Sequence, residues 1–225
     1  MTVSRRALAV LPLGALAAAA AAAPAGAALL RTDACVRYVA RQATMPIYGE
    51  GFTPNGFVTL STVTKAKPAP STFSSSVVQP SGAFLKVTTP PAFSSFNRNL
   101  ETFGLVGVDS ANPAAPVLAT FQVVRFGLTT KPTPSRPTTR VTYTARGFTP
   151  GKPVYVHFRF DGKTRRSVKL GVASGPCGIV ALRMRALPTK ARYGTWTTYT
   201  NQSRTFSAGT RPAWKDSFTI YRRFF

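Results

Sequence analysis

The chain has 225 residues, 44% of them apolar, which is enough for one large hydrophobic core or two small ones. Its 29 Lys and Arg residues outnumber 6 Asp and Glu residues, so the formal net charge is +23 and favours polyanions as partners without specifying which. A single histidine, two distant cysteines and six scattered acids argue against an acid/base enzyme, a zinc site and a calcium cage. We therefore expect neither a metal nor a cofactor.

Residues 1–27 have the pattern of a secretory signal peptide. Arg5 and Arg6 supply the positive start, Ala7 to Ala23 the apolar run, and Ala25-Gly26-Ala27 a small-residue cleavage site. Cleavage there predicts a secreted, extracellular protein with no membrane segment. The alternative is that the apolar run is retained as a membrane anchor. The paired arginines leave both the Sec and the Tat export routes open.

The segment 28–126 contains no convincing helix. Runs rich in Val, Thr, Phe and Tyr alternate with Pro, Gly, Ser and Asn clusters about every ten residues, which is typical of β-sandwiches. Phe96 to Glu101 and Asn112-Pro113 are predicted loops. The predicted strands are Cys35 to Val39, Met45 to Gly49, Phe57 to Val63, Ser75 to Val78, Ala83 to Thr88, Phe103 to Val108 and Val117 to Phe126.

A proline-rich linker is predicted at 127–138. It contains Lys131-Pro132-Thr133-Pro134 and Arg136-Pro137, and alternating prolines favour an extended, fairly stiff spacer. The alternative is that part of it forms an edge strand, because Phe126 and Leu128 can continue the preceding strand.

The segment 139–225 has the clearest strand pattern. Val154 to Phe160 alternates four apolar residues with polar ones, so His157 is predicted on the polar face. Asp161-Gly162 predicts a two-residue hairpin turn, and Trp196 a core aromatic. The predicted strands are Val154 to Phe160, Arg165 to Leu170, Ile179 to Arg185, Gly194 to Thr200 and Phe218 to Phe224.

These two segments match each other at nearly constant spacing. The tetrapeptide Gly-Phe-Thr-Pro occurs twice, 96 residues apart, each time before a β-rich run. Ordered matches of this kind indicate a duplicated unit, and therefore two tandem all-β domains at 28–126 and 139–225. Three pairs of segments match in order: 51–54 with 147–150, 82–84 with 178–180, and 120–123 with 217–220.

The motif G-F-T-P-x-x-x-V, here Gly147 to Val154, and the late strand Gly194-Thr195-Trp196 resemble bacterial immunoglobulin-like domains. In tandem copies they are similar to secreted, uncharacterised proteins of high-GC Gram-positive bacteria. The resemblance implies immunoglobulin-like β-sandwiches and brings no catalytic residues with it. The chain departs from antibody-type domains because neither repeat contains a cysteine pair.

The two cysteines, Cys35 and Cys177, lie in different repeats. In an exported protein an even count favours a disulfide, which here would clamp the two domains together. Two buried free thiols, or an intermolecular bond through Cys35, remain alternatives, because sequence does not give the distance between the residues.

The second repeat holds most of the charge. Residues 139–225 contain 17 basic and 2 acidic residues, a net charge of +15, against 8 and 4, a net of +4, for 28–126. Because guanidinium groups suit phosphates and carboxylates, we predict a site for an anionic cell-envelope polymer. The alternative is a solvated outer face in a protein whose genome favours Arg. The candidate residues are Lys163, Arg165, Arg166, Lys169, Arg183, Arg185, Lys190 and Arg192.

The predicted function is an exported, non-enzymatic structural or adhesive protein of the cell envelope, whose partner is an anionic wall polymer or a surface protein. One alternative is a carbohydrate-binding module that uses exposed aromatics such as Trp214 and Tyr199. Another is a hydrolase built around His157. No nucleic-acid-binding motif occurs, so specific nucleic-acid binding is not expected.

Overall fold

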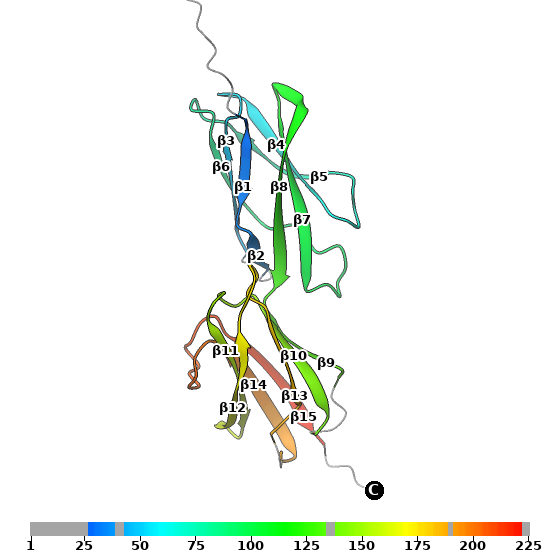
Figure 1. The fold of residues 1–225 in the computed structure, drawn as a ribbon, viewed down its shortest axis with the longest axis vertical. Coiled ribbons are helices and arrows are strands. Elements are labelled where there is room, and N and C mark those ends of the chain that lie inside the picture. Colours follow the sequence, from blue (N-terminus) through cyan, green and yellow to red (C-terminus); the bar gives the residue numbers. More distant parts are fainter. Residues whose placement is uncertain (1–26, 39–42, 134–137, 189–190, 222–225) are drawn as a thin grey trace, which may run out of the picture.

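The computed structural model describes residues 27–38, 43–133, 138–188 and 191–221. Within these ranges the chain is all-β, with fifteen strands. The same ranges contain no helix that is long and apolar enough to cross a membrane. Apart from Ala27, the predicted signal peptide lies outside the described residues. Figure 1 shows two β-sandwiches stacked end to end along the long axis.

The first sandwich, here called unit one (27–125), packs a three-stranded sheet, β1-β3-β6, on a five-stranded sheet, β2-β8-β7-β4-β5. Neighbouring strands are antiparallel except β2 and β8, which are parallel. This is an immunoglobulin-like arrangement. The strands are β1 (Leu29–Thr32), β2 (Cys35–Tyr38), β3 (Met45–Glu50), β4 (Phe57–Val63), β5 (Ser71–Val77), β6 (Phe84–Thr88), β7 (Leu100–Asp109) and β8 (Asn112–Arg125).

The second sandwich, here called unit two (127–221), repeats this plan. Its three-stranded sheet is β9-β10-β13, and its four-stranded sheet is β12-β11-β14-β15. The predicted tandem immunoglobulin-like fold is therefore confirmed. The strands are β9 (Gly127–Lys131), β10 (Arg140–Arg146), β11 (Pro153–Phe160), β12 (Lys163–Val172), β13 (Val180–Arg185), β14 (Gly194–Asn201) and β15 (Trp214–Ile220).

Each unit has its own hydrophobic core. In unit one, Ile47 and Leu60 pack from facing sheets and are fully buried. In unit two, Phe158 packs with Tyr143 and with Trp196, which confirms the prediction of a core tryptophan. Strand alternation produces both cores, since every second side chain of β4 or β11 points inward.

The duplication extends to individual backbone hydrogen bonds at the Gly-Phe-Thr-Pro turns. The N–H of Phe52 donates to the carbonyl of Gly82 at 3.0 Å, and the N–H of Phe148 donates to that of Gly178 at 3.3 Å. Both acceptor glycines have positive φ, +79° and +55°, a conformation that residues with a Cβ adopt rarely. In each unit the tetrapeptide thus supplies the N–H of a backbone hydrogen bond that links two loops.

A polar side chain from the end of the neighbouring strand fixes each of these turns. In unit one the carboxylate of Asp109 accepts the N–H of Thr53 at 2.8 Å and that of Ala111 at 3.0 Å. In unit two the amide of Gln202 accepts the N–H of Thr149 at 3.2 Å and donates to its carbonyl at 2.8 Å. Burial alone would raise the pKa of Asp109, but these N–H donors outweigh it and lower the pKa.

Replacing Asp109 by Asn should therefore cost about 1–2 kcal/mol at neutral pH, because a charge-assisted acceptor becomes a neutral one. Because the folded pKa is lowered, the carboxylate stabilises the fold above its unfolded pKa of about 3.9, and this contribution disappears as pH falls through the folded value. Urea unfolding of both proteins at a series of pH values measures the difference. A gap that does not narrow in acid would contradict this role of Asp109.

Three sequence predictions are corrected by the strands. Gly127–Lys131 form β9 and pair with β10, so this half of the predicted spacer belongs to unit two; 134–137 lie outside the described residues. The reason is that Phe126 and Leu128 pack against the core of unit two. The predicted loop at Asn112-Pro113 begins β8, and the predicted loop Phe96 to Glu101 overlaps β7, which begins at Leu100. The strands β1 and β10 were not predicted.

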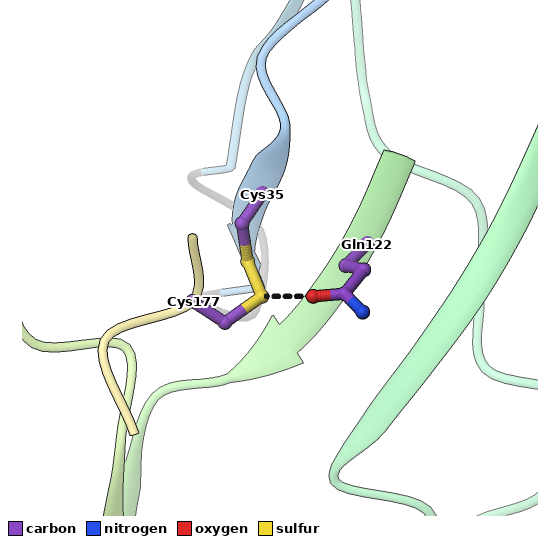
Figure 2. The surroundings of a disulfide bond; sticks show 3 residues. All are labelled: Cys35, Gln122 and Cys177. Carbon is purple, nitrogen blue, oxygen red and sulfur yellow. Dashed lines mark hydrogen bonds between the residues drawn. A yellow bond between two sulfur atoms is a disulfide. The ribbon is translucent and has the colours of Figure 1, made fainter. Parts of the chain in front are cut away.

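The two units are joined by a disulfide between Cys35 and Cys177, with a Cα–Cα distance of 5.2 Å. Figure 2 shows Cys35 on β2 of unit one, Cys177 on a loop of unit two, and Gln122 of β8 beside them. The Gln122 amide oxygen lies 3.3 Å from the Cys177 sulfur. The N–H of Gly147, in the second Gly-Phe-Thr-Pro turn, donates to the Cys177 carbonyl, so the clamp holds that turn against unit one.

Candidate functional site

Four of the predicted polyanion-binding residues lie on β12, the edge strand of the four-stranded sheet of unit two. The hairpin turn before it is confirmed, since Asp161 and Gly162 both have positive φ. A register shift after Phe158 breaks the alternation of the strand near Arg165. The cationic side chains on this strand are all exposed; they are Lys163, Arg165, Arg166 and Lys169.

The remaining predicted cations are elsewhere. Arg183 and Arg185 lie on β13, in the other sheet, and point outward because Leu182 and Met184 pack inward. Arg192 is exposed, and its carbonyl accepts a hydrogen bond from the Trp196 indole at 2.9 Å. Lys190 lies outside the described residues. The structure therefore divides the predicted set between the two sheets.

Three further cations share the outer face of the three-stranded sheet with Arg183 and Arg185. Lys131 is on β9, and Arg140 and Arg146 are on β10. Sequence reasoning missed them because it placed β9 in a linker and did not predict β10. The signal was present in Val141, Tyr143 and Ala145, whose alternation with polar residues predicts a strand with outward-facing arginines. We call these five residues the basic face: Lys131, Arg140, Arg146, Arg183 and Arg185.

The basic face is held by hydroxyl contacts as well as by strand pairing. A guanidinium nitrogen of Arg146 donates to Thr129 Oγ1 at 2.8 Å. Partial burial lowers the pKa of Arg146, yet a guanidinium remains charged at any physiological pH. Across the strands, Arg183 and Lys131 lie on either side of Thr142. Strand pairing therefore fixes the backbone positions of the five cations relative to one another.

The acids are placed unequally between the units. In unit one, Glu50 pairs with Arg31 at 3.0 Å, and Glu101 approaches Arg98 at 4.0 Å. The two acids of unit two are Asp161, in the hairpin turn, and Asp216, which accepts the N–H of Ser217. Neither of these lies on the three-stranded sheet, so the described strands β9, β10 and β13 carry cations and no acid.

His157 lies on the predicted face of β11, opposite the core residue Phe158, but it is fully buried there. Its Nδ1 is 2.7 Å from Ser167 Oγ, and its Nε2 is 3.1 Å from Asn201 Oδ1. Because Nε2 faces acceptor oxygens, it carries the hydrogen, and the hydroxyl donates to Nδ1. Phe206 packs edge-on against the ring, since the loop after β14 covers this part of the sheet.

This Ser167, His157, Asn201 arrangement has the hydrogen-bond order of a hydrolase triad. A catalytic base must also reach the leaving group, and His157 exposes 0% of its surface. The geometry is instead that of a polar bridge between β11, β12 and the loop after β14.

We expect His157→Ala to lower the free energy of unfolding by about 2–4 kcal/mol, because it leaves a cavity and buried polar groups without partners. Ser167→Ala, a change at an exposed position, should cost about 1 kcal/mol. Neither variant should alter hydrolysis of a generic ester by the protein. Ester hydrolysis that disappears with Ser167→Ala would show that the triad is catalytic.

Trp214 and Tyr199 are half-buried rather than fully exposed. Trp214 packs against Phe126 at 6.1 Å between ring centroids, and Tyr199 against Phe206 at 5.0 Å. Tyr199 also lines a shallow recess together with Arg159, Asp161, Gly162, Thr195 and Thr197.

The sequence matches no known protein family and no curated protein. Among solved structures, it is similar to a tetra-tandem repeat of a large adhesion protein, with 16% identity, TM-score 0.27, and coverage of 84% of this chain and 48% of that one. The human OSCAR ligand-binding domain gives 12% identity, TM-score 0.31, and coverage of 86% and 97%. A bacterial ice-binding adhesin gives 12% identity, TM-score 0.27, and coverage of 85% and 63%.

The chain thus spans about half the length of the adhesion-protein structure. The resemblance to secreted proteins of high-GC Gram-positive bacteria stays a prediction.

Proposed function

We propose that this is an exported, non-enzymatic structural or adhesive protein of the cell envelope, which attaches to anionic wall polymer through the cations of unit two. The observation that best supports the proposal is the difference in net charge between two units that share one fold. Residues 139–225 have a net charge of +15 and residues 28–126 a net charge of +4, although both build the same sandwich. A positive charge concentrated in one of two similar units supports a role for that unit in attachment to a polyanion.

The clamp between the units supports the structural part of this proposal. Unit one continues into unit two through Phe126, which packs against Phe148 with 5.0 Å between ring centroids. The disulfide closes the other side of the junction. Two sandwiches held in this way form a short rod that projects one unit when the other is attached. A disulfide between the two units suits an oxidising location outside the cell.

Fractionation of cells and medium tests the proposal. The mature protein should co-purify with the wall and be released progressively as the salt of the wash is raised above physiological ionic strength, because contacts to polyanions weaken steeply with salt. Recovery in the cytoplasm, or wall association that salt does not affect, would contradict it.

The recess beside Tyr199 favours a second candidate function, binding of a sugar. An aromatic edge, two threonine hydroxyls and a guanidinium line it. Binding there would depend mainly on hydrogen bonds to neutral hydroxyl groups, so the salt-insensitive outcome of the fractionation belongs to this candidate.

A further inference from the structure

Because the two units share one fold, the sheet of unit one can be compared position by position with the basic face of unit two. Because the turns at Gly51 and Gly147 are equivalent, each outward position of β9, β10 and β13 has a counterpart in β1, β3 and β6 or directly beside them. For example, Arg146 ends β10 where Glu50 ends β3, one residue before the turn glycine. In unit one the positions equivalent to the basic face are occupied by Asp33, Thr44, Glu50, Val87 and Thr89.

The five cations of the basic face in unit two therefore correspond to two acids and three uncharged residues in unit one. A genome that favours Arg would raise the number of arginines in both copies. The need to cover a sheet face with long side chains would also act on both, because the pairing of the strands is the same. Neither general cause explains the difference, so a requirement specific to unit two remains.

The arrangement of the basic face also costs stability. Arg140 and Arg185 are directly opposite each other on antiparallel strands, and like charges in this position are destabilising. An anion lying between them relieves that repulsion. The outer-face neighbours of these cations on β9, β10 and β13 are Thr, Ala and Gly residues, which carry no charge.

The dimensions of the face favour a single extended polymer chain. Three strands spaced by about 4.8 Å make it about 10 Å wide, and seven residues of β10 make it about 20 Å long. Four of its five cations are arginines, whose fork geometry matches oxyanions bearing two accessible oxygens. We propose that the basic face is the attachment site, and that it binds one extended strand of a linear polymer with regularly spaced oxyanions.

This assignment rests on the proposed function and locates it on one sheet. The test uses the full mature, oxidised chain and two fluorescent probes of equal charge, linear polyphosphate and polyglutamate, which distinguish phosphate from carboxylate ligands. Two variants remove four charges each. The face variant is Lys131→Gln, Arg140→Gln, Arg183→Gln and Arg185→Gln; the control variant is Lys163→Gln, Arg165→Gln, Arg166→Gln and Lys169→Gln.

The wild type should bind at least one probe at 50 mM salt and lose about 50- to 130-fold in affinity by 200 mM, as four to five contacts to a single strand predict. The face variant should lose more than about 10-fold at 50 mM salt and the control less than about 3-fold, with thermal melting showing that both are folded. Equal losses would overturn the assignment to this face and leave the proposed function intact. Failure of the wild type to bind either probe would contradict both the assignment to the basic face and the proposed function. Tighter binding of duplex DNA than of both probes would overturn the assignment to a single extended strand.

Discussion

Replacing both cysteines, Cys35→Ser with Cys177→Ser, should lower the free energy of unfolding by about 4–5 kcal/mol. The bond closes a loop across a sequence separation of 142 residues, and in the chain-entropy model a loop of this length restricts the unfolded state strongly. The relative orientation of the units should also broaden, because motion between domains is the default when no covalent clamp is present. Guanidinium unfolding measures the first effect and small-angle scattering the second.

The control is the wild type under reducing conditions, which should behave as the serine variant does. The packing of Phe126 against Phe148 remains in both cases, so the units should stay folded. A variant with wild-type stability and an unchanged scattering profile would show that the disulfide does not hold the units together.

A single added methyl group at Gly178 should be one of the most damaging substitutions in the chain. Its φ is +55°, and a Cβ there would lie 1.6 Å from the carbonyl oxygen of Phe148. The backbone of Phe148 cannot move aside without breaking the hydrogen bond from its N–H to the Gly178 carbonyl, which links two loops of unit two. We expect Gly178→Ala to cost more than about 4 kcal/mol or to prevent unit two from folding.

Gly151→Ala is the matched control. Gly151 also has a positive φ, +77°, but a Cβ there meets nothing within 4 Å. It should therefore cost only about 1 kcal/mol, the ordinary penalty for a left-handed residue with a side chain. Thermal melts of both variants separate steric conflict from backbone preference. Equal losses would mean that the close approach at Gly178 is relieved by local movement.

Much of the fold follows from local patterns. The alternation of Val154 to Phe160 and the Asp161-Gly162 turn predicted β11 and its hairpin, because period-two burial and positive-φ turns depend on neighbouring residues alone. The spacer at 127–138 was partly wrong because its prolines gave the stronger local signal. The strand β9 forms through pairing with β10 and through Leu128 at the core, both of which are tertiary effects.

The site was less predictable than the fold. Alternation correctly placed His157 on the face opposite Phe158, but the loop that contains Phe206 covers that face, and no local pattern indicates such a cover. The predicted basic set mixed two sheets because proximity in sequence was taken for proximity in space. Lys131 and Arg140 join Arg183 only through strand pairing.

The proposed attachment to polyanion uses the three-stranded sheet of unit two and not the equivalent sheet of unit one. Amide hydrogen exchange of the mature chain, with and without linear polyphosphate, tests this directly because it compares equivalent strands in one molecule. We predict slower exchange in β9, β10 and β13, and unchanged exchange in their counterparts β1, β3 and β6. Equal protection of both sheets, or protection centred on β12, would contradict the account.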